Sequence, residues 1–473
     1  MLFSQTLKQA KPSITPLSDR VGRMARLALT SCLAVSFVAA TTPASAQRRG
    51  SLPLVRDAEI EALLKDYSTP IFKAAGLGKG AVDVYIVNDD SFNAFVSGRR
   101  MFVNTGALKR AETPNEIIGV IAHETGHVVG GHQIRMRNNI DKANLLAVLT
   151  MIAGAGAMAF GGDAGSAGGQ ALALGSRSSI MRNLLAYQRS EEAAADSTAL
   201  QLLNKTHQSP KGMLKTFERF SKEMLFSGSR IDPYLQSHPM PRDRIALLEK
   251  TANASPYYDA KDPAQLQLRH DMARAKIAAY SGNAGELQNL FRDDPRGPAA
   301  RYGLAISMYL HASNDKAIPI IDGLIKEQPK NLYLYEIKGE ILLSSGHARE
   351  AVAAFTKARD LDPYHTGLIR IALGHALLET YDKSLLPQAL KELTVGVGYD
   401  RSYPRGHGLL ARAYAASGQP DMARAAAAEE AYYSFRINDA KRLAHTAQPK
   451  LKSGSREWLR MQDIIDYKPP KKR

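Results

Sequence analysis

The stretch His123-Glu124-Thr125-Gly126-His127 is the most informative part of this sequence for predicting the fold around it. Two histidines four residues apart lie on the same side of a helix, where both imidazoles can bind one zinc ion. A glutamate directly after the first histidine is placed to handle a proton of a water molecule. The spacing is typical of metalloproteases. It predicts His123 and His127 as zinc ligands and Glu124 as the catalytic base.

Signals for a helix surround this stretch. Thr113-Pro114-Asn115-Glu116 has the pattern of a capping box with proline at the first helical position. The residues that follow supply apolar faces at helical spacing, namely Ile117, Ile118, Val120, Ile121, Val128 and Val129. We therefore expect both histidines in the middle of one helix.

A zinc site of this kind needs a third protein ligand. The alanine-rich helical segment 187–196 offers Glu192 as our candidate, and Asp196 follows one turn later, where it can fix the tautomer of a ligand histidine. Glu191 is an alternative ligand, because adjacent helical residues differ by about 100° in direction. These acidic residues could also be solvated surface charges. The histidine pair upstream makes a metal site the better explanation.

His132 is a further histidine near the motif. Metzincins carry a third histidine six residues after the second, with a glycine between them. Gly130 fits that pattern, but His132 comes one residue early. On an unbroken helix it points about 140° away from His127. We predict a structural or supporting role for His132, so that the ligands are two histidines and a glutamate and one position stays open for water.

Peptide hydrolysis follows from such a site. Zinc lowers the pKa of a water to about 7, and Glu124 takes the proton and passes it to the leaving amine. The second oxygen of the tetrahedral intermediate needs a partner, for which the proline-rich segment 237–244 supplies His238, Arg242 and Arg244. An ordinary basic surface turn is the alternative explanation of this segment.

Two segments before the motif predict strands. Residues 81–87 and 101–104 are rich in β-branched and aromatic side chains and are separated by Gly98, which predicts a small antiparallel sheet. An edge strand beside the metal could bind a substrate as an added strand, and Asn93, Ala94 and Phe95 are the candidate substrate-binding residues. A plain sheet that only packs the catalytic helix is an equal alternative.

Taken together, these motifs resemble the BepA-type metalloproteases, gluzincins related to the CAAX prenyl endopeptidases. The likeness spans most of residues 55–440. It rests on Asn93-Ala94-Phe95, Phe102-Val103-Asn104-Thr105-Gly106, the histidine motif, Glu192 with Asp196, and Ser237-His238-Pro239.

The resemblance implies a role for each matching residue. Glu192 would be the third ligand of a single zinc ion, and Asp196 would support the site. His238 would approach the zinc and keep the enzyme latent as a switch, and Arg244 would bind the intermediate, with Arg242 as a local alternative. The glycine-rich stretch after residue 153 departs from the family pattern and leaves open how the active site is covered.

The beginning of the chain predicts export. Basic residues precede an apolar run at 27–40 and an Ala-x-Ala site, which is typical of a cleavable signal peptide comprising residues 1–46. Met24 is an alternative start. Cys32 lies in a sequence like a lipoprotein processing box, but it follows Arg26 too closely for a normal apolar core, so lipidation is the weaker interpretation.

Composition narrows the setting. Cys32 is the one cysteine of the chain and falls in the predicted leader, so the mature protein would have neither disulfides nor thiolate zinc ligands. We expect a periplasmic protein. The net charge of +16 favours anionic neighbours such as lipid head groups, and hence peripheral membrane contact. The sequence holds no recognisable nucleic-acid module, and we expect no such partner.

Residues 143–160 form one internal segment apolar enough to suggest a membrane span. A single crossing there would put His123 and Glu192 on opposite sides of the membrane, so we predict a packed or interfacial helix instead. The glycines of residues 161–175 predict a mobile loop after it, which would act as a lid or plug. A disordered insertion without a role is the alternative.

The second half of the chain predicts a repeat protein. Proline recurs at intervals of 34 residues, the tetratricopeptide period, at Pro295, Pro329 and Pro363. The best copy begins near Leu332 and carries the expected small, aromatic and proline positions at Gly339, Ala351, Phe355, Ala358 and Pro363. Another copy at 405–430 follows a few extra residues near 381–387. Such helix pairs stack into a solenoid that binds other proteins.

We therefore expect a mainly α fold in three mature parts. Residues 47–256 form a gluzincin-type metallopeptidase domain with a small antiparallel sheet, and residues 257–440 form an α-solenoid of tetratricopeptide repeats. Residues 441–473 are a C-terminal extension with a basic tail.

The resemblance also implies a task. The enzyme would degrade misfolded or stalled outer-membrane proteins in the periplasm and assist their assembly, with the repeats docking on the assembly machinery. A chaperone or adaptor with a permanently latent metal site is the alternative from another class.

Overall fold

A computed structural model describes residues 52–142, 144, 162–226, 238, 242–311 and 313–469, and the statements below refer to these residues. The predicted signal peptide, nearly all of the apolar segment 143–160 and the last four residues lie outside them. Among the described helices, none combines the length and the apolarity that a bilayer crossing needs.

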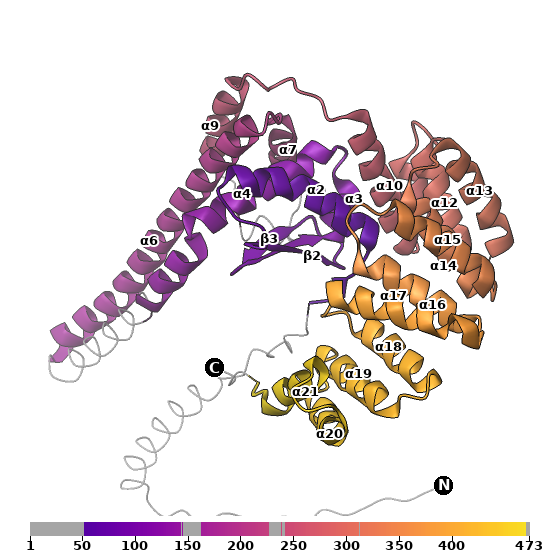
Figure 1. Ribbon diagram of the computed structural model, residues 1–473. Coiled ribbons are helices and arrows are strands. Elements are labelled where there is room, and N and C mark those ends of the chain that lie inside the picture. The colour runs from indigo at the N-terminus through magenta and orange to yellow at the C-terminus, as the bar shows by residue number, and fades with distance from the viewer. Residues whose placement is uncertain are drawn as a thin grey trace, which may run out of the picture. The chain divides into compact units, whose positions relative to one another are not determined.

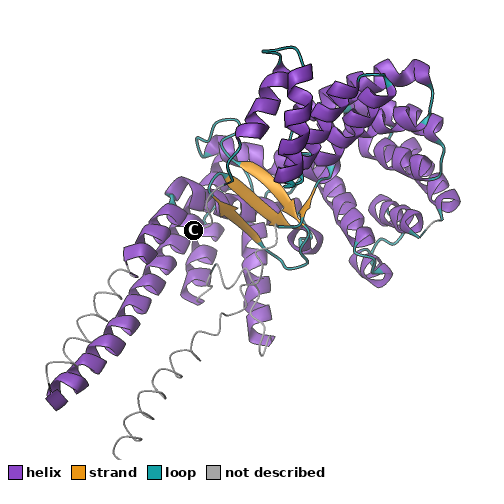
Figure 2. Cartoon of the chain, turned by 90° about the horizontal axis from the view of Figure 1, so that it is seen from below, coloured by secondary structure: helices purple, strands orange, loops and turns teal. Residues whose placement is uncertain are grey.

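A four-stranded sheet with the order β1-β2-β4-β3 lies in the first half of the chain (Figure 2). Its strands are β1 (Leu54–Val55), β2 (Asp83–Val87), β3 (Ala94–Ser97) and β4 (Arg100–Asn104). β3 and β4 form an antiparallel hairpin, but β2 runs parallel to β4. The expected all-antiparallel sheet was therefore wrong. The chain crosses over after β2, and β3 takes the outer edge.

The sheet packs one face against helices. Figure 1 shows α2 (Ala58–Ala74) and α4 (Pro114–Gly130) on the same side of it, with the short α3 (Thr105–Arg110) following β4. Alternate strand residues such as Ile86 and Met101 join Ile117 and Ile121 of α4 in one buried core. The opposite face carries three stacked rings, of Tyr85, Phe102 and Phe95. Thus the strand alternation seats the helix that carries the histidine motif directly on the sheet.

The helix α4 begins where the sequence predicted, with Pro114 at its first position and Thr113 as N-cap. The capping bonds differ from the prediction. The Thr113 side chain makes no cap hydrogen bond, and Glu116 accepts from the backbone N–H of Glu112 at 3.0 Å. Glu116 is fully buried and pairs with Arg219 at 2.8 Å. Its carboxylate therefore ties α4 to α7 (Lys211–Phe226) instead of closing a capping box.

The glycine-rich residues after 161 form helix, which overturns the expected mobile loop. Helix α6 extends over Gly162–Lys205, 44 residues, and α9 (Arg242–Asn253) packs against it later in the chain. The intervening residues are mostly alanine and serine, which tolerate helix. Each glycine costs only about 1 kcal/mol relative to alanine, so glycine alone is a weak indicator of a loop.

Pairs of helices make up the repeat region. After α10 (Ala264–Tyr280) and α11 (Ala284–Leu290), first helices of 13 residues alternate with second helices of 14 residues. The pairs are α12 (Pro298–Leu310) with α13 (Asn314–Glu327), α14 (Leu332–Ser344) with α15 (Ala348–Leu361), α16 (Gly367–Glu379) with α17 (Leu386–Tyr399), and α18 (Pro404–Ala416) with α19 (Pro420–Tyr433). The tetratricopeptide solenoid is confirmed.

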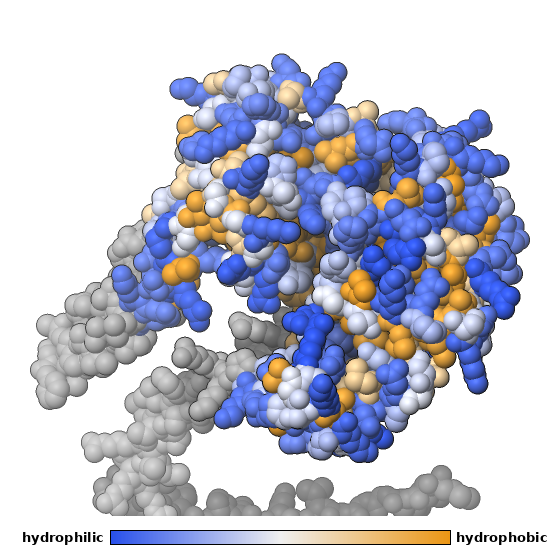
Figure 3. All heavy atoms as spheres, in the orientation of Figure 1, coloured by the Kyte–Doolittle hydropathy of each residue, from blue (hydrophilic) through white to orange (hydrophobic). Residues whose placement is uncertain are grey.

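Side-chain packing explains the repeat pattern. A Cβ on Gly339 would lie 2.8 Å from the Phe355 ring, so the glycine of α14 is what admits the aromatic side chain of α15. Ala351 and Ala358 on the same helix are fully buried. The extra residues near 381–387 include the 3-10 turn η1 (Lys383–Leu385). In Figure 3 apolar side chains gather in patches over the repeat helices, separated by hydrophilic ones.

Helices continue past residue 440. α20 (Ile437–Ala447), the turn η2 (Gln448–Lys450) and α21 (Arg456–Asp466) follow α19. Ala440, Ala444 and Met461 share a buried core with alanines of α19. The first part of the predicted C-terminal extension is thus packed against the solenoid.

Helix α2 belongs to both halves of the described chain. Its Leu63 and Tyr67 lie in the core beneath α4, whereas Ala58 and Ala62 pack against Leu332 and Tyr333 of the repeats.

Buried charges join the two halves at the start of the same helix. Lys276 of α10 pairs with Asp57 at 2.7 Å and with Glu59 at 3.3 Å, and the Tyr302 hydroxyl donates to Glu59 at 2.8 Å. Lys276 and Glu59 are 6% and 3% exposed. Burial raises the pKa of Glu59, although Lys276 opposes the shift. The two carboxylates therefore depend on a single cation.

Replacing that cation should be costly. We predict that Lys276→Ala lowers the free energy of unfolding by about 3–5 kcal/mol, because it leaves buried carboxylates unpaired. Denaturant unfolding measures the loss, with Lys326→Ala on an exposed helical position as the control. A loss below about 1 kcal/mol would contradict this account of the interface.

Candidate metal centre

Helix α4 presents its two histidines to the same point. His123 is fully buried and His127 is 8% exposed. Their Nε2 atoms lie 3.1 Å apart, and the rings meet edge to face with centroids 4.7 Å apart. The four-residue spacing therefore has the consequence that the sequence predicted.

A close crossing brings α6 to these histidines. A Cβ on Gly126 would lie 2.8 Å from the carbonyl oxygen of Ala195, so only glycine lets the two backbones approach this closely. Glu192 of α6 then reaches the site, with Oε2 3.4 Å from His123 Nε2 and Oε1 3.4 Å from His127 Nε2. The candidate third ligand stands beside both imidazoles.

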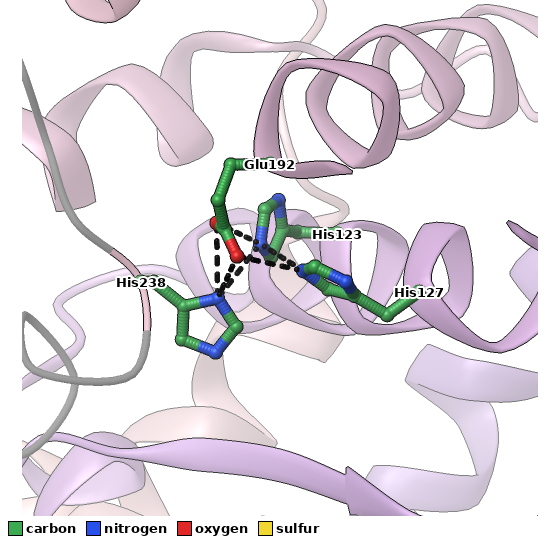
Figure 4. A group of neighbouring side chains, drawn as sticks. All are labelled: His123, His127, Glu192 and His238. Atoms are coloured by element: carbon green, nitrogen blue, oxygen red, sulfur yellow. Dashed lines mark hydrogen bonds and ion pairs between the residues drawn. The ribbon is translucent and has the colours of Figure 1, made fainter. Parts of the chain in front are cut away.

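His238 completes the group from a separate segment. Its Nδ1 atom lies 3.3 Å from His123 Nε2 and 3.1 Å from each oxygen of Glu192. Figure 4 shows the four side chains converging, with His123 and His127 on one helix. One donor atom from each residue lies within 4.8 Å of all the others, and all four residues are buried.

The geometry of the donor atoms fits a metal ion. Ligand atoms about 2.0–2.1 Å from a tetrahedral zinc are separated by roughly 3.3–3.4 Å. The separations of neighbouring donor atoms, 3.1 to 3.4 Å, match these distances. His123 Nδ1 lies 2.9 Å from Asp196 Oδ1, which leaves the Nε2 lone pair directed at the centre. Three histidine nitrogens and a carboxylate grouped this closely are a ligand set that a metal cation can bind.

Asp196 and Arg244 hold this arrangement from behind. Arg244 donates through Nε to Asp196 at 2.5 Å and pairs through Nη1 with Glu192 at 2.9 Å. Although burial opposes the shift, hydrogen bonds from Arg244 and His123 lower the pKa of Asp196. Hydrogen bonds with His123 and His238 likewise overcome burial and lower the pKa of Glu192. Both carboxylates therefore stay ionised, and the observed Arg244 contacts are with them.

A second chain of contacts supports His127. Its Nδ1 atom lies 2.8 Å from Nδ1 of His132, whose Nε2 lies 2.7 Å from Glu191. Arg135 in turn donates to Glu191 at 2.7 Å. His132 thus stands to His127 as Asp196 stands to His123. Glu191, the alternative ligand, faces His132 and not the donor group.

A helix break makes this contact. The argument that kept His132 off the metal assumed an unbroken helix, but α4 ends at Gly131, which has a φ of 65°. That left-handed conformation suits glycine and turns the next residue back toward His127. His132 is consequently a neighbour of the candidate ligand His127. The estimate of about 140° between the two residues did not predict this contact, because it assumed a continuous helix. The Gly130-Gly131 pair was the available signal.

The two motif histidines have opposite electrostatics. Burial disfavours a proton on His123, but Asp196 and Glu192 raise its pKa to about 9. Burial and the charge of His123 lower the pKa of His127 to about 2. Two adjacent imidazoles in a buried site do not both stay protonated, and a neutral His127 is ready to act as a ligand.

Glu124 points at the same centre without being one of the donors. Its Oε1 lies 3.4 Å from His238 Nε2 and is buried without a hydrogen-bond partner among the described residues. Burial raises the pKa of Glu124. A buried carboxylate oxygen of this kind is suited to a water or a substrate proton.

The candidate substrate-binding residues lie beside this carboxylate. A cavity of about 570 Å³ is lined by Asn93, Phe95, Glu124 and His127 among others. Asn93 Oδ1 is buried without a hydrogen-bond partner in the described chain, and Ala94 is fully buried on the edge strand β3. Asn93 and Phe95 therefore line the cavity beside the centre, and Ala94 lies between them in the chain. The Arg242 side chain lies outside the described structure.

A histidine pair on a buried helix, a carboxylate from a second helix and a free base define a metallopeptidase. The comparison with known families agrees, because residues 55–252 match the model of peptidase family M48. This match supports a metalloprotease, and a family of metalloproteases implies a metal cofactor.

Relatives extend the likeness beyond that domain. The chain is 24% identical over 430 residues to the β-barrel assembly-enhancing protease of Escherichia coli, covering 89% of this chain and 85% of the relative. A putative β-barrel assembly-enhancing protease of Vibrio cholerae is 28% identical over 295 residues, covering 60% and 58%. The solved structure of MamA MSR-1 C2 matches 35% of this chain and 93% of its own at 18% identity, with a TM-score of 0.30.

Removing the support of His127 should weaken metal binding. We predict that His132→Ala lowers zinc affinity about 10- to 100-fold, because His127 loses the partner that fixes its ring and tautomer. Competition with a chelator measures the affinity, and His347→Ala on an exposed position serves as the control. An unchanged affinity would show that the contact between His132 and His127 has no part in holding the metal.

Proposed function

We propose that this protein is a zinc-dependent endopeptidase that cleaves extended segments of unfolded chains. The observation that carries the proposal is the convergence of His123, His127 and Glu192, with Glu124 alongside and its Oε1 buried without a hydrogen-bond partner in the described chain. Histidine nitrogens and one carboxylate are the ligand set that hydrolytic zinc sites use.

The chain's own residues supply the rest of the reaction. A bound zinc ion supplies Lewis acidity, which lowers the pKa of a water to about 7 and polarises a carbonyl. Glu124 takes the proton and returns it to the leaving amine. The backbone of Ala94 and the side-chain oxygen of Asn93 hold the substrate backbone along the edge strand, since strand pairing there requires no particular substrate side chain. For Arg244 to bind the intermediate, its guanidinium group must first release its ion pair with Glu192.

The substrates proposed are misfolded or stalled outer-membrane proteins in the periplasm, whose assembly the enzyme also assists. The names of the relatives support a role in β-barrel assembly. Unfolded β-barrel strands suit an active site that binds by strand addition. The apolar run and cleavage site at the start of the sequence support export.

The repeats are proposed to dock the enzyme on the outer-membrane assembly machinery. Stacked helix pairs expose a long surface for protein partners while the peptidase core stays closed. The positive charge of the chain supports additional peripheral contact with anionic lipid.

A second function is favoured by one observation. His238 Nδ1 lies within 3.3 Å of His123 and within 3.1 Å of Glu192, at the position a catalytic water would need. With that position filled, the protein would act as a latent chaperone or adaptor through its repeats. We propose that this latent arrangement is the resting state and that displacement of His238 activates cleavage.

Loss of the base separates protease from adaptor. We predict that Glu124→Gln lowers the rate of cleavage of an unfolded outer-membrane protein by about 10²- to 10⁴-fold, with zinc content unchanged. Peptide release and metal analysis measure the two quantities, and Glu218→Gln on an exposed helical position is the control. If Glu124→Gln fully restores outer-membrane assembly in cells that lack the protein, the adaptor function is the principal one.

Opening the fourth position should raise activity. We predict that His238→Ala increases basal cleavage several-fold while zinc remains bound, since His123, His127 and Glu192 stay in place. Initial rates with a fluorogenic unfolded substrate measure this, and His445→Ala is the control. A fall in rate would instead assign His238 a direct part in the reaction.

A further inference from the structure

The free edge of β3 is partly covered by this chain's own side chains. Asn104 donates through its backbone N–H to the carbonyl of Asn93 at 2.9 Å, so Asn93 belongs to the residues that bond inward to β4. In an antiparallel pair the inward and outward residues alternate. The backbone groups of Ala94 and Val96 therefore point outward, toward the position of an added strand. The N–H of Gly98, in the turn after β3, donates to Gln133 on the same side.

Gln133 occupies that position at one end. Its Nε2 donates to the Val96 carbonyl in a short hydrogen bond, and its Oε1 accepts from the Gly98 N–H at 3.0 Å. One carboxamide thus provides the donor and the acceptor that one residue of a neighbouring strand would provide through its N–H and C=O. Val96 also hydrogen-bonds through its backbone to Glu124. Ala94 is then the remaining outward residue, and no described residue forms a hydrogen bond with its outward backbone groups.

The location and exposure of Gln133 suit a replaceable group. It lines the same cavity of about 570 Å³ as Glu124, His127 and Glu192. It is solvent-exposed and lies two residues after the helix break at Gly131. Moving an exposed glutamine side chain costs little beyond the two hydrogen bonds, and an incoming strand can replace both.

We propose that Gln133 is a specificity-determining cap on the substrate edge, which limits short peptides to pairing at Ala94 and yields only to a longer extended segment. This inference rests on the proposed binding of substrate along β3. At about 3.4 Å per residue, a strand reaching from Ala94 past Gly98 needs several residues beyond the cleavage region. Long unfolded segments meet that need, and short peptides do not. Covering Val96 and Gly98 also protects the resting edge from unwanted strand pairing.

Peptide length provides the test. Fluorescence anisotropy would measure the affinity of two labelled extended peptides, of about four and about ten residues with a common centre, for the zinc-loaded protein carrying Glu124→Gln. Gln133→Ala and Gln133→Met remove the hydrogen bonds, and Met keeps most of the bulk. Ile134→Ala is the matched control, because Ile134 is the next residue after Gln133 and its side chain is 71% exposed.

We expect both Gln133 variants to bind the long peptide on the order of tenfold more tightly and the short peptide unchanged, with no effect of Ile134→Ala. Equal changes for both peptides, or weaker binding of the long one, would overturn the cap and leave Gln133 a structural link between helix and sheet. Failure of the Glu124→Gln protein to bind either peptide also overturns it. Binding of the long peptide without cleavage by the protein with native Glu124 would instead count against the proposed endopeptidase alone.

Discussion

The metal centre depends on a contact that involves almost no side chain, the passage of α4 over α6 at Gly126. A methyl group there would meet the Ala195 backbone at under 3 Å, so a larger residue would move α6 outward. Glu192 and Asp196 lie on either side of Ala195 on α6, and both would move with it. Ligand geometry at a metal tolerates only a few tenths of an ångström. The small residue inside the histidine motif is therefore as necessary to the centre as the two imidazoles.

The sequence predicted the parts of this centre that depend on local spacing. His123 and His127 are one turn apart on any helix, and Glu192 with Asp196 repeats that relation on α6. Tertiary relations were harder. Alternating strand residues look the same in parallel and antiparallel pairs, so the direction of β2 could not be inferred. The position of His132 depended on a helix break, and the Arg244 contacts depended on the folding of a distant segment. In the repeats a fixed period determines the neighbours, and the solenoid was predictable.

Two opposing demands meet at the edge of the cavity. The proposed reaction needs the Oε1 atom of Glu124 available and a strand edge open to substrate, whereas a protease that meets unfolded chains must limit both. In the proposed function each demand is met by a side chain that resembles the group replacing it. His238 lies among the candidate ligands, where the proposal places a water, and the Gln133 carboxamide takes the place of a residue of an added strand. Each side chain makes contacts similar to those of the group that is proposed to replace it. The replacement therefore changes few interactions.

The sharing of α10 between the two halves has a consequence for dissection of the molecule. Ala273 and Ile277 belong to the peptidase core, and the buried His270 joins the Tyr67 hydroxyl to the carbonyl of Ala111 at 2.9 Å each. A truncated enzyme ending at residue 256 would expose that apolar surface. It would also leave the Tyr67 hydroxyl without its hydrogen bond to His270. A fragment that keeps these contacts of α10 extends at least to Ile277, and the packing of α2 against Leu332 and Tyr333 would still be lost. The peptidase core therefore includes the first helix of the repeat region, α10. The two parts cannot be separated at residue 256 without exposing that core.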